Sequence, residues 1–159
     1  MLNETIKCLE IKKDGAYVDL TFGGGGHSKA ILNFLSEKGK LIAFDQDLDA
    51  IENKIDDERL LLLNQNFKFL KQNLNFYGYD FVDGVLADLG VSSFQFDSLV
   101  RGFSIRNGSN LDMRMNKNGK LTASEILNNY SEKELSNIFF EYSDLRNSRS
   151  IAKLIVEKR

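Results

Sequence analysis

The stretch Tyr17-Val18-Asp19-Leu20-Thr21-Phe22-Gly23-Gly24-Gly25-Gly26-His27-Ser28 joins a short apolar run to four consecutive glycines. A short apolar run bounded by turn residues is typical of a buried strand. Glycines after such a strand let the backbone approach a ligand closely, and the amide groups at the start of the next helix attract anions. The stretch therefore predicts a strand over residues 16–20, a glycine-rich turn and a following helix that stops at Gly39.

Strand and helix patterns then alternate along the chain up to Gly90. This alternation is the signature of parallel βαβ units with right-handed crossovers. We therefore expect an α/β fold with a doubly wound parallel sheet. The further predicted strands cover residues 41–45, 60–63 and 81–87, and the predicted helices between them cover 50–55 and 67–77.

Past Gly90 the pattern changes. Residues 91–120 are rich in Ser, Asn, Gly and Arg and show no sustained period, which predicts a long functional loop. Two capping boxes, Thr122 with Glu125 and Ser131 with Glu134, then predict helices, and a third helix is expected from about residue 148. Apolar stripes on the last two helices indicate helix-on-helix packing by Leu135, Ile138, Phe139, Tyr142, Ile151, Leu154 and Ile155.

Length and composition bound the class of protein. At 159 residues, with 42 % apolar and 28 % charged residues, the chain can bury a core. Its single cysteine, Cys8, excludes an internal disulfide and is interpreted as a small buried residue on a helix face. No apolar run approaches the roughly 20 residues that span a bilayer, so we expect a soluble, cytoplasmic protein without a membrane partner.

Charge is distributed unevenly along the chain. The net charge of -2 gives no global indication of nucleic-acid binding, because dedicated binders often have a basic domain. Residues 101–120, however, carry five Lys or Arg and one Asp, and residues 146–159 carry five Lys or Arg and one Glu. Either segment could bind phosphate groups, although solvated helix and loop faces commonly produce such runs.

Acidic and aromatic residues follow the predicted strands. In an open α/β sheet, ligands bind beyond the carboxyl ends of the strands. Asp45 stands nineteen residues after Gly26, in the place of the acidic residue that accepts hydrogen bonds from ribose hydroxyls. The strand ends are expected to bring one set of residues to a single crevice, namely Asp19, Asp45, Asn66, Phe67 and Asp88.

The glycine loop alone does not decide the cofactor. A dinucleotide fingerprint needs a third glycine where this sequence has Ser28, so an NAD or FAD site is imperfect. S-adenosylmethionine (AdoMet) fits better, with its carboxylate at the loop amides, its ribose at Asp45 and its adenine against Phe67. Alternatively, Asp45 caps a helix or is an exposed loop acid, Phe67 is a staple residue at a helix start and His27 is a capping residue. Because His27 is the only histidine, no metal cluster or catalytic triad built on several histidines is expected.

Four further motifs accompany the stretch over residues 17–28. They are Ala43-Phe44-Asp45-Gln46-Asp47, Asp88-Leu89-Gly90-Val91-Ser92-Ser93, Arg101-Gly102-Phe103-Ser104 and Leu111-Asp112-Met113-Arg114-Met115. Together, the five motifs resemble the bacterial small-subunit ribosomal RNA methyltransferase H family. The resemblance covers essentially the whole chain, and the last two motifs are far more specific than any glycine loop.

The resemblance implies a Rossmann-like class I methyltransferase fold, of which this sequence holds a part. Residues 1–100 would be the N-terminal part of the AdoMet-binding domain. Residues 101–159 would be a loop and the helical start of an inserted substrate-recognition domain. The remainder of the family fold would lie beyond this sequence.

The activity implied by the resemblance is AdoMet-dependent methylation of N4 of a cytidine in 16S ribosomal RNA, with the small ribosomal subunit as partner. The oligomeric state is left open. Asp88 is expected near the methyl donor and the substrate amine, as a cofactor contact or as a catalytic proton acceptor. The implied AdoMet contacts are Gly25, Gly26, His27, Asp45, Phe67, Asp88 and Gln95, of which Gln95 rests on the resemblance alone.

The arginine-rich segment is expected to contact RNA phosphates while the target base is unstacked. Its predicted RNA-binding residues are Arg101, Arg106, Asp112 and Arg114. Alternatively, Asp112-Met113-Arg114 forms a structural latch. Two other functions stay open for the chain, an NAD-dependent oxidoreductase and a catalytically silent RNA-binding fragment.

Overall fold

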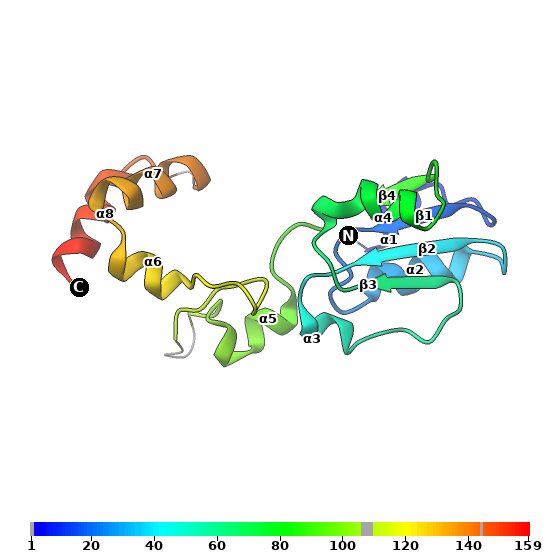
Figure 1. The fold of residues 1–159 in the computed structure, drawn as a ribbon, viewed down its shortest axis with the longest axis horizontal. Helices are drawn as coiled ribbons and strands as arrows, with labels where there is room; N and C mark the ends of the chain where they lie inside the picture. Colours follow the sequence, from blue (N-terminus) through cyan, green and yellow to red (C-terminus); the bar gives the residue numbers. More distant parts are fainter. Residues whose placement is uncertain (1, 106–109, 144) are drawn as a thin grey trace. The chain divides into compact units, whose positions relative to one another are not determined.

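The structure, a computed structural model, describes residues 2–105, 110–143 and 145–159 (Figure 1). The chain divides into two compact units. The first comprises Met1–Ser92 with Met115–Lys117, and the second comprises Ser93–Arg114 with Asn118–Arg159. Every strand of the described residues belongs to the first unit, whereas the regular structure of the second unit is helical.

The first unit is built on a four-stranded parallel sheet. Its strands are β1 (Ala16–Asp19), β2 (Lys40–Phe44), β3 (Leu60–Leu63) and β4 (Gly84–Leu86), in the order β3-β2-β1-β4. Asp19 at the end of β1 stands in register with Ala43 of β2 and Leu86 of β4. Since the chain leaves β1 toward β2 and later returns to pair β4 on the other side, the switch in strand order falls beside β1. Ligands bind at such switch points in α/β sheets.

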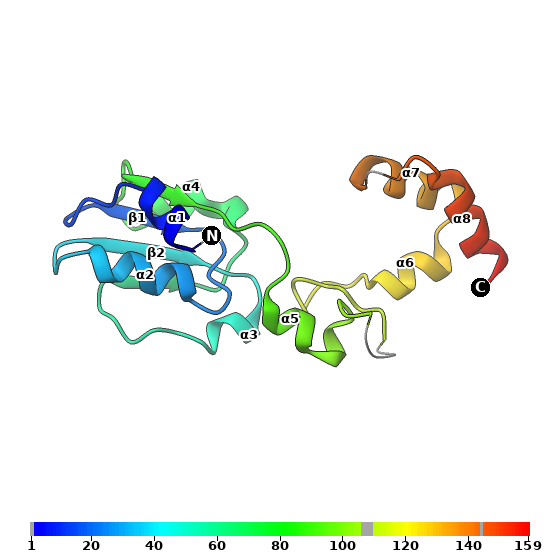
Figure 2. The ribbon, with the colours of Figure 1, turned by 180° about the vertical axis from the view of Figure 1, so that it is seen from behind.

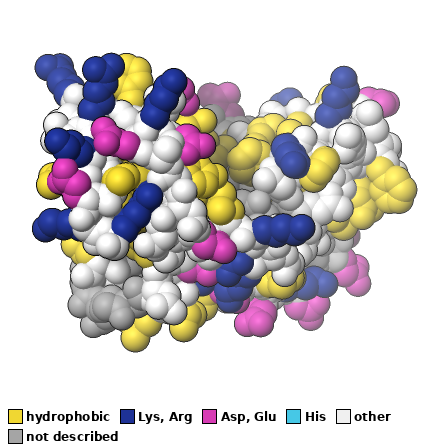
Figure 3. All heavy atoms as spheres, turned by 60° about the vertical axis from the view of Figure 1, so that its left-hand side comes forward, with side chains coloured by type: hydrophobic (Ala, Val, Ile, Leu, Met, Phe, Trp, Pro, Cys, Tyr) yellow, Lys and Arg dark blue, Asp and Glu magenta, His cyan; other side chains and the backbone are white. Residues whose placement is uncertain are grey.

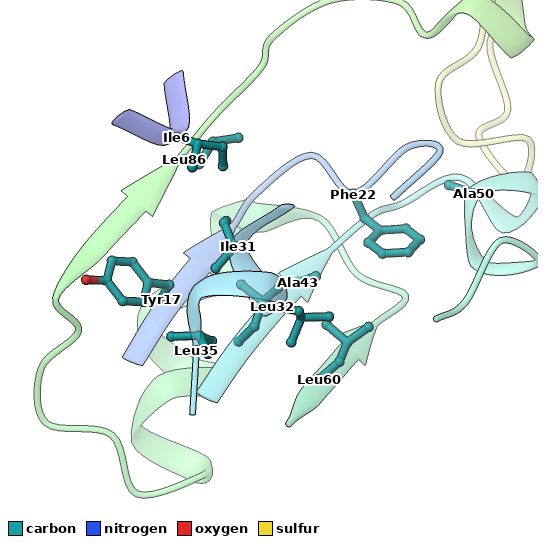
Figure 4. Packing of buried hydrophobic residues seen from close by; sticks show 11 residues of the cluster. Ile6, Tyr17, Phe22, Ile31, Leu32, Leu35, Ala43, Ala50, Leu60 and Leu86 are labelled. Carbon is teal, nitrogen blue, oxygen red and sulfur yellow. The ribbon is translucent and has the colours of Figure 1, made fainter. Parts of the chain in front are cut away.

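Helices cover both faces of this sheet. They are α1 (Leu2–Cys8) and α2 (Gly26–Phe34) on one face and α4 (Leu70–Phe76) on the other. Successive strand side chains point to opposite faces. Tyr17 therefore packs in the core that contains Ile31 of α2 (Figure 4), and Val18 lies in the separate core that Leu74 of α4 covers. Burying a side chain such as Ile31, which is 0 % exposed, stabilises the fold by roughly 1.5–3 kcal/mol. The predicted α/β fold with a doubly wound parallel sheet is thereby confirmed.

Three predicted helices of the first unit have different bounds. The helix predicted to stop at Gly39 is α2, which already ends at Phe34. The helix predicted over 50–55 is instead α3 (Leu48–Ile51), which starts earlier because the Asp47 carboxylate accepts a hydrogen bond from the Asp49 amide and caps it. The helix predicted over 67–77 begins with the 3-10 helix η1 (Phe67–Phe69) and continues as α4.

Two other predictions, the extent of the fourth strand and the burial of Cys8, relied on the apolar character of the residues and differ from the structure. The fourth strand, predicted over 81–87, spans only Gly84–Leu86, and Phe81 lies before it with 77 % of its surface exposed. The interpretation of Cys8 as buried was wrong. Cys8 is exposed, because α1 buries only Ile6 against the sheet.

The described residues of the second unit form five helical segments. They are α5 (Ser93–Asp97), η2 (Leu99–Arg101), α6 (Ala123–Asn129), α7 (Glu132–Tyr142) and α8 (Ser148–Glu157). The prediction of a continuous loop over 91–120 was wrong where α5 and η2 form, because helices of five and three residues are too short to display a 3.6-residue period. Both predicted capping boxes are present, at Thr122 with Glu125 and at Ser131 with Glu134.

Helices α7 and α8 pack side by side (Figure 2). The contact between the two helices confirms the predicted helix-on-helix packing, and Leu135 of the predicted stripe on α7 is 0 % exposed. Ala152 of α8 is also 0 % exposed, although it was not part of the predicted stripe. The stripes are buried only in part, since Tyr142 is 81 % and Leu154 is 53 % exposed. Leu154 belongs instead to an open apolar groove beside α6.

Gly102 predicts a stability difference that can be measured. Its φ is +73°, and a Cβ there would lie 2.5 Å from the Asn110 oxygen and 2.6 Å from the Asp112 nitrogen, both backbone atoms. Gly78 has a φ of +77° but open space around it. We expect Gly102→Ala to lower the free energy of unfolding by about 2–4 kcal/mol and Gly78→Ala by only about 1–2 kcal/mol in denaturant titrations. Equal losses would show that the close approach at Gly102 is not the cause.

Candidate cofactor-binding site

The glycines of the loop between β1 and α2 differ in how much space surrounds them. Gly25 precedes α2 with a φ of +74°, and a Cβ there would lie 3.0 Å from the ring of Phe22, which is itself 2 % exposed. Gly25 is therefore needed for the fold of the loop. A Cβ on Gly24 or Gly26, in contrast, would meet no atom within 4 Å. These two positions leave space in which a ligand can approach the backbone.

A buried carboxylate lies under this loop. Asp19 is 0 % exposed, and its Oδ1 accepts a hydrogen bond from the Thr21 amide at 3.0 Å. Its Oδ2 accepts one from the Ser28 hydroxyl at 2.7 Å. Burial raises the pKa of the Asp19 carboxyl above its ordinary value, against the opposing effect of these hydrogen bonds. Asp19 thus shapes the loop from within.

Asp45, at the end of β2, joins the glycine loop to the neighbouring strand. Its Oδ2 accepts a hydrogen bond from the Gly23 amide at 2.8 Å, and its Oδ1 accepts one from the Asp47 amide at 2.9 Å. Asp45 is therefore not the helix cap, because the side chain that caps α3 is that of Asp47. A carboxylate has about four lone-pair sites, so Asp45 can accept further hydrogen bonds from ligand hydroxyls.

The end of β3 supplies an aromatic ring. Asn66 caps η1, since its Oδ1 accepts a hydrogen bond from the Lys68 amide at 2.9 Å, and its Nδ2 donates to Gln46 at 2.9 Å. Phe67 follows as the first residue of η1 and is 40 % exposed. Part of its ring is therefore available for stacking with a flat ligand.

The end of β4 meets the loop after β1. The Leu20 amide donates to the Leu86 oxygen at 2.9 Å, and the Asp88 amide donates to Thr21 Oγ1 at 2.8 Å. The side chain of Asp88 is 62 % exposed, and its Oδ2 lies 3.8 Å from His27 Nδ1. Asp88 thus presents an accessible carboxylate next to the start of α2.

The structure brings most predicted cofactor residues to one edge of the sheet. A hydrogen bond joins the glycine loop to Asp45, His27 lies 3.8 Å from Asp88, and Phe67 follows the next strand end. Gln95 lies on α5 in the second unit and is 6 % exposed. Thr21 and Ser28 were missed as site residues. An acid two residues before Thr21 is a typical Asx-turn signal and could have indicated its contact with Asp19.

The predicted RNA-binding residues make contacts within the second unit. Arg101 is 2 % exposed, and its Nη2 donates to the Arg114 oxygen at 2.8 Å. Arg114 donates two parallel hydrogen bonds to the Asp112 carboxylate, from Nε to Oδ1 at 2.8 Å and from Nη2 to Oδ2 at 2.6 Å. It also donates to the Gly119 backbone oxygen. Arg106 lies outside the described residues. These contacts favour the latch interpretation of Asp112 and Arg114, while RNA contact by this segment stays a prediction.

The Asp112–Arg114 pair predicts a pH dependence of stability. Hydrogen bonds from Arg114 lower the pKa of the Asp112 carboxyl below its ordinary value of 3.8. Because the folded-state pKa is the lower one, the stabilising contribution is present above pH 3.8 and is lost as the pH falls through the folded-state pKa. We expect Asp112→Asn to lower the free energy of unfolding by about 1 kcal/mol or less at neutral pH and by less in strong acid. A difference independent of pH in denaturant titrations would contradict this role.

Other kinds of site find no support in the part of the chain that the structure describes. Within it, no three or more His, Cys, Asp or Glu side chains gather as a metal site would require. No helix among these residues is both long and apolar enough to cross a membrane. On the face drawn in Figure 3, Lys and Arg side chains are interspersed with acidic and hydrophobic ones. A single continuous basic surface is therefore not seen on that face.

Comparison with known proteins gives consistent matches. Residues 1–159 match the MraW methylase family. The chain is similar to the ribosomal RNA small subunit methyltransferase H of Christiangramia forsetii, with 55 % identity over 100 % of this chain and 53 % of that relative. Proteins of the same name from Flavobacterium psychrophilum and Phocaeicola vulgatus are 56 % and 49 % identical over the whole chain, which covers 55 % and 52 % of their lengths. The chain thus spans about half the length of the curated relatives it matches.

Proposed function

The chain belongs to the MraW methylase family, and we propose that its protein transfers a methyl group from AdoMet to N4 of a cytidine in 16S ribosomal RNA. The main observation behind this proposal is the hydrogen bond of 2.8 Å that the Gly23 amide of the glycine loop donates to Asp45 Oδ2. This contact supports the proposal, because a carboxylate that could accept hydrogen bonds from ribose hydroxyls lies beside a backbone that a ligand could approach. The names of the similar proteins support the RNA substrate.

The residues of the first unit fit AdoMet. The space over Gly24 and Gly26 would admit the methionine end of the cofactor against the loop. Asp45 would accept hydrogen bonds from the ribose, and the exposed part of the Phe67 ring would stack with the adenine. When bound, AdoMet would supply a methyl group on a positively charged sulfur.

The charge of the loop argues for AdoMet over NAD. The Asp45 and Asp88 carboxylates lie beside the loop, and Ser28 replaces the third glycine of a dinucleotide fingerprint. Nearby carboxylates repel a pyrophosphate and attract a cationic centre. The alternative of an NAD-dependent oxidoreductase therefore has no observation in its favour.

Asp88 would act on the RNA amine. The lone pair of the cytosine N4 is delocalised into the ring, so a hydrogen-bond acceptor at this amine favours its rehybridisation toward the methyl donor. The exposed Asp88 carboxylate is suited to accept that hydrogen bond and then the departing proton. Transfer of the methyl group is an in-line displacement, for which correct placement supplies much of the rate.

The second unit would contribute to RNA binding, with the 16S ribosomal RNA of the small subunit as partner and the cytoplasm as the place of action. Arg101 and the Asp112–Arg114 pair would shape the segment that meets the RNA, and Arg106 belongs to the same segment. The target base has to leave its stack before an enzyme can reach N4. Gln95 would contact AdoMet from α5.

The test is methylation of isolated small ribosomal subunits by a full-length protein, extended to the length of the relatives. Radiolabelled AdoMet is expected to label one cytidine at N4, identified by nuclease digestion and mass spectrometry. Subunits from cells that already carry the modification serve as the control and should accept no label. Binding of RNA without AdoMet binding or methyl transfer would instead favour a silent RNA-binding function.

A further inference from the structure

The position of Asp88 depends on a backbone contact. Its side chain is 62 % exposed, and its Oδ2 lies 3.8 Å from His27 Nδ1. The Asp88 amide, however, donates a hydrogen bond to Thr21 Oγ1 at 2.8 Å. A hydroxyl after β1 therefore holds the residue that follows β4.

Thr21 is itself fixed by a hydrogen bond to the buried Asp19. Its amide donates to Asp19 Oδ1 at 3.0 Å, and Asp19 Oδ2 accepts the hydroxyl of Ser28 at 2.7 Å. Asp19 and Ser28 are both 0 % exposed, so this pair is rigidly packed. His27 precedes Ser28 on α2, and its Nδ1 lies 3.8 Å from Asp88 Oδ2. The contacts of Asp19, Ser28 and His27 therefore also lead to Asp88.

We propose that Thr21 is a positioning residue for methyl transfer, whose hydroxyl fixes the backbone of Asp88 so that its carboxylate stays beside the glycine loop. This inference rests on the proposed function. It also gives Ser28 a role that a glycine could not fill, because glycine has no side-chain donor for the buried Asp19.

The expected effect is on the rate of transfer. A misplacement of reacting groups by about 1 Å can cost roughly 100-fold in rate. Thr21→Val preserves the shape of the side chain and removes the acceptor for the Asp88 amide. We therefore expect the single-turnover rate at saturating AdoMet to fall by about 10- to 100-fold, while the dissociation constant for AdoMet changes by a few-fold at most.

The experiment compares full-length wild type with Thr21→Val, Thr21→Ser and Thr5→Val. Thr21→Ser keeps the hydroxyl and should retain a rate close to that of wild type, and Thr5→Val on α1 controls for the substitution itself. Calorimetry with AdoMet gives the dissociation constants. If Thr21→Val does not fold, Thr21→Ala compared with Thr21→Ser isolates the hydroxyl.

Three results would overturn the inference. They are an unchanged rate in Thr21→Val, an equal loss of rate in Thr21→Ser, or a loss of AdoMet affinity that accounts for the whole loss of rate. A wild-type protein that neither binds AdoMet nor methylates the subunit would instead refute the proposed function. The two failures are thus distinguishable.

Discussion

Asp88→Ala in the full-length protein is expected to lower the single-turnover methylation rate by about 100- to 10,000-fold, the usual contribution of a positioned proton acceptor. We expect a lower rate rather than a loss of folding, because in this variant the backbone amide at position 88 still donates to Thr21 and the fold of the loop is kept. The Asp88 side chain is 62 % exposed, so its removal leaves no cavity in the core. Rapid-quench measurements at saturating AdoMet give the rate.

Asp88→Asn is the matched control for this experiment. Asparagine keeps the size of the side chain and one oxygen acceptor but cannot take up the proton of the amine. A rate as low as that of Asp88→Ala is expected if Asp88 accepts the proton. Full retention of the rate by both variants would exclude a catalytic role for Asp88.

Gly26→Ala is expected to weaken AdoMet binding by about 10- to 100-fold without loss of stability. A Cβ on Gly26 meets no protein atom within 4 Å, so it would occupy the space that the proposed ligand needs. A clash of this kind costs about 1–3 kcal/mol. Alanine in place of glycine in a helix adds up to about 1 kcal/mol of stability, and Gly26 is the first residue of α2.

Two measurements on Gly26→Ala separate binding from folding. Calorimetry gives the AdoMet dissociation constant, and denaturant titration gives the free energy of unfolding. Weaker binding together with equal or greater stability would locate the ligand over Gly26. Wild-type affinity in this variant would place the cofactor elsewhere.

The parallel sheet and the edge at which its strands end were predictable because they depend on local patterns. The run before Asp19 and the run before Asp45 are apolar on both faces, as strands covered by helices on both sides must be. Parallel strands then bring their carboxyl ends to one edge, so the placement of Asp45 and Asp88 followed from the order of the elements.

Long-range contacts of single atoms were not predictable in the same way. The bond between Thr21 and Asp88 joins residues 67 positions apart, and no period of the sequence signals it. Ser28 was interpreted only as a departure from a glycine fingerprint, whereas it donates to the buried Asp19. Arg101 was interpreted from its charge, and its burial is visible only once its contact with the Arg114 backbone is known.

The most direct test of the account is a calorimetric titration of AdoMet into the full-length protein, with NADH titrated in parallel. We predict binding of one AdoMet per chain, competition by S-adenosylhomocysteine and no heat of binding with NADH. Binding of NADH, or the absence of any AdoMet binding, would contradict the assignment of the glycine loop and Asp45 as the AdoMet site.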